Sequence, residues 1–573
     1  MIGSVAAAAQ PPPLAPARVE AVIATARLYS VVRYFHPGDV NSRVPWDRFL
    51  VAATESALSV RNAGDIGSML EETFSVFGTD VQLKRGEFGD SAAPYNRGRY
   101  WTEWRHMGIG IGQRTAQPVY RSWRLARDDP PAEAFGEGVA RPAPGRWSVV
   151  SLAAGWNARV AVSMSSADAL ITRAQDERLA RMHEELPAWD PKAAAVTRAQ
   201  SLASGIAVWS IARHFYPYWP DVATDWDSAF RGWVATQPAT QSRTALLASL
   251  KSLTARMDDG HAGVSDLQVQ AQRRSPPLAL RPLGESYVVT ASGHPDIAPG
   301  DVIETIDSRP VAEVARAILQ GTSAGAHSRP WLARNALLQG EGTASRLGLR
   351  RGASVREVVV SYPGGEAVRE KRPEPIAELA PGIRYVDASR FNRAAFEKEL
   401  PRLGAANAIV FDLRGYPTGD AYDLAGYWVG AKEEARWMHV PILARPFEAP
   451  VGSVDHGWNV KPKPGIEGVR KILMIDPRAI SYSESLVGYF AAHAKGVIVG
   501  EPTAGANGNV STVELPGMFA FRFTGMRVTA HDGKVFHARG FQPDVVVVPT
   551  VEGIAAGRDE VLERAVELAR QPR

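Results

Sequence analysis

The chain has 573 residues, with 65 Lys and Arg against 61 Asp and Glu and no cysteine. This length is enough for several domains, and the small net charge of +4 gives no basic surface of the kind that binds nucleic acid. The lack of cysteine excludes disulfides and thiolate chemistry, and no apolar run approaches the about 20 residues of a membrane span, so we expect no stable membrane insertion.

The first 18 residues are rich in Ala and Pro. The Ala run followed by Gln in MIGSVAAAAQPPPLAPARVE is similar to the small-residue end of a signal peptide. A disordered tail is the alternative. The first interpretation predicts a periplasmic or secreted protein, and the second leaves a cytoplasmic location open.

The first half of the chain contains an internal repeat. The segment LYSVVRYFHPGDVNSRVPWDRFL (residues 28–50) aligns without a gap with VWSIARHFYPYWPDVATDWDSAF (residues 208–230) at an offset of 180. Identical pairs include Ser30/Ser210, Arg33/Arg213, Phe35/Phe215, Pro37/Pro217, Trp46/Trp226 and Asp47/Asp227. In each copy a helical pattern ends near a Pro, and Trp-Asp opens a second one. We therefore predict duplicated helical modules at residues 19–84 and 166–275.

The two copies differ at one position whose side chain could take part in catalysis. The second copy reads MDDGHAGV (residues 257–264), so that His261 stands opposite Val81 of the first copy. A single histidine is most often a satisfied core or surface residue. A tight Asp-Asp-Gly-His turn after a helix, absent from the sister copy, favours a function such as general base for His261.

Between the two copies, residues 85–165 are rich in Trp, Tyr, Arg and Gly. Runs such as RWSVVSLAAGWNARVAVSMS alternate apolar and polar residues, which predicts a β-rich segment. Its aromatic side chains could form a surface for glycans or peptides. Burial inside the sheet is the simpler interpretation.

Residues 276–365 show short strands, a Pro-Gly-Asp turn at residues 299–301, the strand-like run VIETID and a helix from about Val311. The stretch APGDVIETIDSRPV resembles the corresponding motif of PDZ domains. The resemblance implies capture of an extended or C-terminal peptide at a sheet edge, with a purely structural PDZ-like domain as the alternative.

The last part, residues 366–573, alternates apolar strands with helical patterns. This alternation predicts an α/β domain, in which functional residues follow the strand ends. Two strand ends carry polar loops: DLRGYPTG after the strand that ends at Phe411, and SYSE after the strand that ends near Asp476.

Three serines, Ser481, Ser483 and Ser485, stand between the second of these strands and a helical pattern. A serine at the start of a helix can be a nucleophile, because helix N-terminal amides favour a developing oxyanion. It can equally be a helix N-cap. Chemistry alone does not choose among the three.

The segment ISYSESLVGYFAAHAKGVIVGEPTAG resembles the catalytic segment of the tail-specific, or C-terminal processing, serine peptidase family. FDLRGYPTG resembles the DLR…G loop of that family, and RGFQPDVVV (residues 539–547) its closing Gly-x-x-Pro-Asp segment. The resemblance extends over about residues 202–547. It implies a multidomain α+β protein with a PDZ-like domain and an α/β peptidase core of the ClpP/crotonase type.

Carried over residue by residue, the resemblance implies that Ser481 is the nucleophile and Glu484 its trailing glutamate. The backbone amides of Gly419 and Tyr482 would then form the oxyanion hole. Ser483 and Ser485 would be local helix-start or packing residues.

The chain departs from the bacterial processing proteases in one respect. Those enzymes place a lysine base just after the GEPT-x-G stretch, where this chain has Ala506 and Asn507. The tricorn-like branch uses a histidine from before the PDZ region, and DDGHAGV resembles that motif, which implies that His261 is the general base. The residue that orients His261 remains open. In the tricorn-like branch a glutamate precedes the Gly-x-x-Pro-Asp segment, but the corresponding position in this chain is His537. The candidates are therefore the nearby acids Asp258, Asp259, Glu484 and Glu501.

The implied function is a serine endopeptidase that hydrolyses peptide bonds by Ser-His acyl transfer, with peptides or unfolded proteins as partners. No cofactor and no metal are expected, because no cluster has ligand spacing such as His-Glu-x-x-His. The alternatives are an inactive, peptidase-like binding protein and a serine esterase or amidase. The sequence gives no oligomeric state.

Overall fold

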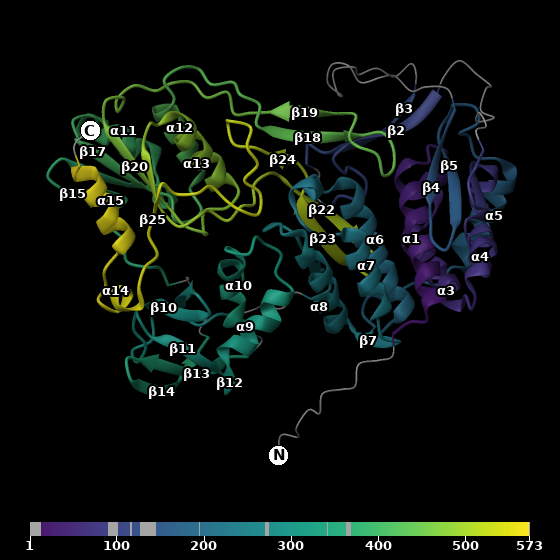
Figure 1. Cartoon of the computed structure of the whole chain (residues 1–573), viewed down its shortest axis with the longest axis horizontal. Coiled ribbons are helices and arrows are strands. Elements are labelled where there is room, and N and C mark those ends of the chain that lie inside the picture. Colours follow the sequence, from purple (N-terminus) through teal and green to yellow (C-terminus); the bar gives the residue numbers. More distant parts are fainter. Residues whose placement is uncertain are drawn as a thin grey trace.

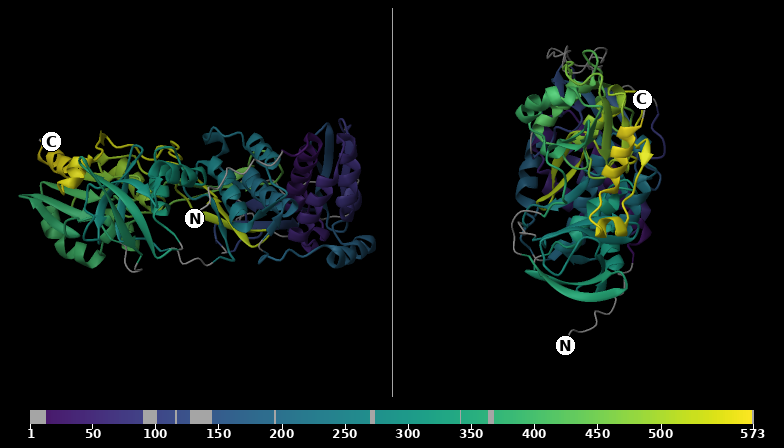
Figure 2. Two further views of the ribbon diagram at one scale, coloured as in Figure 1. Left: turned by 90° about the horizontal axis from the view of Figure 1, so that it is seen from below. Right: turned by 90° about the vertical axis from the view of Figure 1, so that its left-hand side faces the viewer.

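The computed structural model describes residues 13–89, 101–114, 117–126, 145–193, 195–269, 274–340, 342–362 and 368–571. It is a mixed helix-and-sheet, multidomain protein of elongated outline (Figures 1 and 2). The first helical copy lies at one end and the C-terminal α/β unit at the other. None of the helices in the described ranges is long and apolar enough to cross a membrane. The prediction of a signal-peptide end falls largely on residues 1–12, outside the described residues.

The same order of elements occurs twice at the predicted offset. The first copy consists of α1 (Pro16–Phe35), α3 (Trp46–Ser59), α4 (Ile66–Thr73), the 3-10 turn η2 (Ser75–Asp80) and β1 (Val81–Arg85). The second consists of α6 (Arg198–Phe215), α7 (Trp226–Ala235), α8 (Arg243–Thr254), η5 (Ala255–Met257) and β8 (Gly263–Asp266). The copies pack against each other through α1, α3 and α6 and share one hydrophobic core. Short elements complete this half: α2 (Val40–Arg43), α5 (Arg173–Glu185), β6 (Ala195–Thr197) and β7 (Thr240–Ser242).

The aromatic segment contributes four of the eight strands of an antiparallel sheet. These strands are β2 (Trp101–Met107), β3 (Arg121–Ala126), β4 (Arg146–Ser151) and β5 (Trp156–Ser165). The order β1-β5-β2-β18-β19 continues into a long hairpin from the C-terminal unit, β18 (Met438–Leu443) and β19 (Gly452–His456) (Figure 1). Trp101 is buried, and the indole of Trp104 donates to the carbonyl of His36, so these aromatic side chains pack inside the protein.

Residues 278–361 form a separate antiparallel sheet with its own small core. Its order is β14-β13-β11-β10-β9, and two helices accompany it. The bounds are β9 (Leu278–Leu283), β10 (Ser286–Ser292), β11 (Val302–Ile306), β12 (Arg309–Pro310), α9 (Val311–Gln320), α10 (Arg329–Leu337), β13 (Ala344–Arg351) and β14 (Ser354–Ser361).

The C-terminal unit contains a sheet with the order β15-β16-β17-β20-β21-β25, parallel from β16 onward. The strands are β15 (Ile376–Ala380), β16 (Ile383–Asp387), β17 (Ala408–Asp412), β20 (Arg470–Ile475), β21 (Val497–Gly500) and β25 (Val545–Val546). Helices α11 (Arg393–Gly404), α12 (Asp423–Trp428) and α13 (Tyr482–His493) share a core with one face, and α15 (Glu560–Arg570) shares a core with the other. The short α14 (Val551–Ala555) precedes α15. Since both faces are covered, these strands are almost uniformly apolar.

A small three-stranded sheet joins the second helical copy to the C-terminal unit. Strand β8 pairs antiparallel with β23 (Phe519–Thr524), which pairs with β22 (Val510–Leu515). The register sets Gly263 opposite Arg522. The short β24 (Arg527–Val528) then pairs with β18. This sheet carries the turn of His261 to the C-terminal unit.

Candidate active site

The structure separates the three serines by what their hydroxyls do. Ser483 is fully buried and donates to the carbonyl of Gly415 at 2.8 Å. Ser485 is also buried and bonds to the side chain of Asn507. Ser481 is half-buried and occupies the N-cap position of α13, but its side chain makes no capping hydrogen bond. Only the hydroxyl of Ser481 is therefore left for chemistry.

Ser481 has an unusual backbone conformation. Its φ is 59° and its ψ is −116°, in a region that is normally reserved for glycine. The residue stands in a sharp turn between β20 and α13, and its N–H donates to the carbonyl of Ala506 at 2.8 Å. Serine nucleophiles of other hydrolases stand on strained strand-to-helix turns of this kind, which present the hydroxyl above the sheet edge.

Glu484 holds the loop that follows β21. Its carboxylate is fully buried and accepts hydrogen bonds from the Thr503 hydroxyl at 2.5 Å, from the Gly505 N–H at 2.7 Å and from the Ala506 N–H at 2.9 Å. Burial raises the pKa of Glu484 to about 7, against the opposing effect of these donors. Because the Ala506 carbonyl in turn accepts from the Ser481 N–H, Glu484 positions this loop beside Ser481.

The raised pKa of Glu484 predicts a pH-dependent stability. Below pH 4.5 the group is protonated in both folded and unfolded chains, and between 4.5 and about 7 ionisation favours the unfolded chain. We expect the free energy of unfolding of the wild type, relative to Glu484→Gln, to fall by about 3 kcal/mol between pH 5 and 8. Urea unfolding at four pH values measures this difference. Glu514→Gln, on an exposed position of β22, is the control, and a difference independent of pH would contradict the expectation.

The turn of His261 lies against the same loop. A Cβ added at Gly260 would stand 3.0 Å from the Ala506 Cβ and 3.3 Å from the Ile480 Cδ1. Gly260 therefore packs near Ile480, which precedes Ser481 in the chain, and near Ala506, whose carbonyl accepts the Ser481 N–H. The structure brings together the two loops that carry Ser481 and His261.

His261 is oriented by Thr524 and Asp259. The Thr524 hydroxyl lies 2.9 Å from His261 Nδ1 and donates to Asp259 Oδ1 at 2.9 Å. Since its only proton goes to Asp259, the hydroxyl accepts from Nδ1–H, and Nε2 of a neutral His261 is left without a proton. Burial lowers the pKa of His261, while Asp259 opposes this effect. An unprotonated Nε2 is what a general base requires.

Asp259 is the buried acid of this arrangement. Its carboxylate also accepts the backbone N–H of His261 at 2.9 Å and that of Thr524 at 2.7 Å, and its own N–H donates to Ser323. The direct distance from Oδ1 to His261 Nδ1 is 3.9 Å, so the threonine hydroxyl bridges the pair.

The other candidates for orienting His261 have different partners. Asp258 pairs with Arg329 at 2.7 Å, and Glu501 pairs with Arg281. His537 is buried, stacks on Tyr218 with a centroid distance of 3.7 Å, and hydrogen-bonds to Tyr216; burial lowers its pKa to about 4.

Two candidate backbone amides, those of Tyr482 and Gly419, lie at helix starts. Tyr482 is the first residue of α13 and Gly419 the first of the 3-10 turn η7 (Gly419–Tyr422), and the first N–H groups of a helix have no partner within it. The Tyr482 hydroxyl donates to the Gly419 carbonyl at 3.1 Å, which holds the two helix starts together. The preceding DLR loop is held by Arg414, which pairs with Asp412 and Asp559.

Comparison with known proteins identifies this part of the chain. Residues 452–547, which include Ser481, match peptidase family S41. The chain contains an S41 peptidase domain. The chain is a serine-type peptidase, a hydrolase, and this match confirms its predicted resemblance to the tail-specific, C-terminal processing peptidases. The search of curated proteins found no match.

Several solved structures are similar to this chain at low sequence identity. Mature CPAF, solved in complex with lactacystin, is 13% identical, with a TM-score of 0.52 over 65% of this chain and 98% of CPAF. The photosystem II D1 C-terminal processing protease is 18% identical (TM-score 0.38; 63% of this chain, 98% of that chain). The tricorn protease is 13% identical, with a TM-score of 0.33, and the match covers 65% of this chain and 37% of the tricorn protease chain.

Thr524, which contacts His261 Nδ1, is a residue of the candidate site that the sequence analysis missed. It lies 263 positions from His261, at the end of the alternating strand FAFRFT. Its only signal is a polar residue at the end of a strand, which is common. The contact depends on the pairing of β8 with β23.

Proposed function

We propose that the protein is a serine endopeptidase in which Ser481 attacks a peptide carbonyl and His261 is the general base. The observation that carries the proposal is that the loop of Ser481, whose side chain makes no capping hydrogen bond, lies against the turn of His261, whose Nδ1 is held by Thr524. Ala506, at the position of the lysine base in other processing proteases, supports histidine in that role.

The proposed reaction is acyl transfer. Nε2 of His261 takes the proton of the Ser481 hydroxyl as its oxygen bonds to the carbonyl carbon, and the amides of Tyr482 and Gly419 stabilise the resulting oxyanion. His261 then protonates the leaving amine, and water attacks the acyl-enzyme with the same histidine as base. Asp259 acts through Thr524 by fixing the tautomer of His261 and by stabilising its protonated form. Glu484 is a positioning residue in this scheme.

Reaction with a fluorophosphonate followed by intact and peptide mass measurement tests the proposal. We expect one adduct per chain, and fragmentation of the labelled peptide, which contains all three serines, should place it on Ser481. An adduct on Ser483 or Ser485, or a protein that folds and stays unlabelled, would overturn it. A comparison of peptide and ester substrates then separates a peptidase from an esterase.

Thr524 offers a test of the bridged arrangement. We expect Thr524→Val, which keeps the shape but removes the hydroxyl, to lower kcat about 10- to 100-fold with little change in KM. The pH profile should change as well, because His261 loses the acceptor that fixes Nδ1–H. Thr524→Ser should restore most of the activity. Equal loss in both variants would indicate a packing role instead.

We also infer that residues 276–365 are a PDZ-like domain that captures peptide substrate. Strand β14 ends the sheet order, and it exposes 66% of Val355 and 57% of Val359. An extended peptide can add to such an edge, with its side chains against these valines.

Substitution at this edge is expected to weaken peptide binding. In a Ser481→Ala background that prevents cleavage, Val359→Glu should lower the affinity for a fluorescent unfolded polypeptide about tenfold. Val149→Glu, which alters a valine that is 58% exposed on β4, is the matched control. Unchanged affinity in Val359→Glu would assign the sheet a structural role.

A further inference from the structure

Three potential metal ligands meet at the end of α13 that is remote from Ser481. Glu433 precedes β18, His493 is the last residue of α13, and His531 follows β24. Each offers one ligand atom, and these atoms all lie within 4.8 Å of one another. A helix rises about 1.5 Å per residue, so the cluster, which packs along α13 from Gly488 to His493, stands about 10 to 18 Å along the helix from Ser481. It is distinct from the catalytic machinery.

The histidines of this cluster have unsatisfied ring nitrogens. The side chain of His531 is only 7% exposed, yet neither of its nitrogens has a hydrogen-bond partner among the described residues. Within the same ranges, Nε2 of His493 is also buried and without a partner. Buried polar atoms are nearly always satisfied, so each such nitrogen calls for a group that the protein alone does not supply.

The carboxylate of Glu433 is fixed in a way typical of metal ligands. One oxygen accepts from the Tyr489 hydroxyl at 2.8 Å, and the other accepts from the Ala435 N–H at 2.8 Å. The second oxygen lies 4.0 Å from Nε2 of His531. Hydrogen bonds to a ligating carboxylate orient it and leave further lone pairs for a cation.

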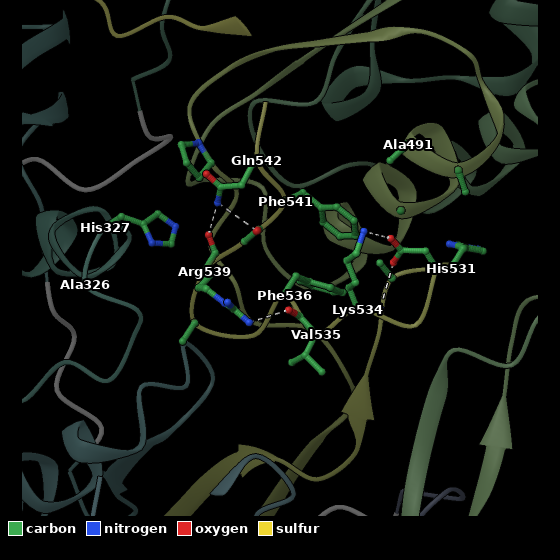
Figure 3. A pocket seen from close by; sticks show the side chains of 17 residues that line it. Ala326, His327, Ala491, His531, Lys534, Val535, Phe536, Arg539, Phe541 and Gln542 are labelled. Carbon is green, nitrogen blue, oxygen red and sulfur yellow. Dashed lines mark hydrogen bonds and ion pairs between the residues drawn. The ribbon is translucent and has the colours of Figure 1, made fainter. Parts of the chain in front are cut away.

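Packing holds the His531 ring in place. It lies edge-on to Tyr489 with a centroid distance of 4.5 Å, and 5.7 Å from the Trp437 ring. A Cβ at Gly488 would stand 3.5 Å from Nδ1, an ordinary van der Waals distance, so the imidazole packs directly on this turn of α13. The ring also forms part of the wall of a cavity of about 980 Å³, on the same side as Ala491 of α13 (Figure 3).

We propose that Glu433, His493 and His531 bind one divalent transition-metal ion, with Zn²⁺ as the best match. Two imidazoles and one carboxylate are a common protein ligand set for Zn²⁺ and leave a fourth position for water. Ligand atoms at about 2.0–2.1 Å from a tetrahedral Zn²⁺ stand about 3.4 Å apart, so closure requires side-chain shifts of about 1 Å.

The ion would join three segments of the C-terminal unit. It would fix the end of α13 to the segment before β18 and to the loop after β24. The sequence analysis predicted no metal, because the ligands stand 60 and 38 positions apart and follow no local spacing.

Zinc binding to the whole chain tests the proposal. Protein freed of metal with a chelator is incubated with ZnCl₂, and the bound ion is counted by elemental mass spectrometry after desalting, with the affinity measured by titration. We expect about one Zn²⁺ per chain in the wild type. Binding should be at least about 100-fold weaker in His531→Ala and His493→Ala. His439→Ala, which removes an imidazole paired with Asp455 outside the cluster, should bind as the wild type does.

A second measurement guards against misfolded variants. Zinc should raise the Tm of the wild type and of His439→Ala, since a ligand that binds only the folded state stabilises it, and should leave the Tm of His493→Ala unchanged. Absence of stoichiometric zinc in the wild type would overturn the proposal in favour of a metal-free carboxylate–imidazole cluster. Zinc retained by both histidine variants would overturn it by placing the ion elsewhere.

Discussion

Ser481→Ala is expected to lower kcat on an unfolded polypeptide such as fluorescent casein by about 10⁴- to 10⁶-fold. The reason is that no other hydroxyl can replace it. Ser483 and Ser485 are buried, and their hydroxyls already bond to Gly415 and Asn507. The free energy of unfolding should not fall, because the Ser481 side chain makes no capping hydrogen bond that alanine would lose.

Ser483→Ala is the matched control for this substitution. It removes a buried hydrogen bond, so it should lower the free energy of unfolding by about 1 kcal/mol while retaining most of the activity. If Ser483→Ala were as inactive as Ser481→Ala, or if Ser481→Ala kept its activity, the assignment of the nucleophile would be wrong.

His261→Ala is expected to cause a loss of similar size, because a serine hydroxyl is a poor nucleophile at neutral pH without a base. The wild-type pH profile gives an independent readout. Only neutral His261 accepts the proton, and burial lowers its pKa below 6.5, so kcat/KM should be constant near neutral pH and fall only below pH 6.5.

The control for this prediction is His294→Ala, in the loop between β10 and β11, which should match the wild type in rate and pH profile. Activity that survives in His261→Ala, or that falls off well above pH 6.5, would assign the base to another group.

Much of the architecture could be predicted from sequence because its signals are local. The repeat, the alternating strands and the strand ends at Phe411 and Asp476 all depend on residues close in the chain. The choice of Ser481 among three serines came from family resemblance, and what distinguishes it physically is a φ of 59° that no local pattern encodes.

The orientation of His261 could not be predicted for a different reason. Asp259 was one of four candidate acids, two next to His261 in sequence and two in the segment that contains Ser481. Only tertiary packing determines which of them lies beside the imidazole. Asp258 is the adjacent residue, yet its left-handed backbone, with a φ of 52°, directs its side chain to Arg329. Glu484 was predicted as a catalytic residue, and the structure places its carboxylate on the loop of residues 503–506.

The pairing of β8 with β23 also has a consequence for biosynthesis. The proposed base precedes the nucleophile by 220 positions, and the threonine that orients it follows the nucleophile by a further 43. A ribosome must therefore complete the chain beyond residue 524 before the histidine can acquire its hydrogen-bond acceptor. Nascent chains and C-terminally truncated fragments would contain a serine without an oriented base. Proteolytic capacity thus arises late, after nearly the whole polypeptide has left the exit tunnel.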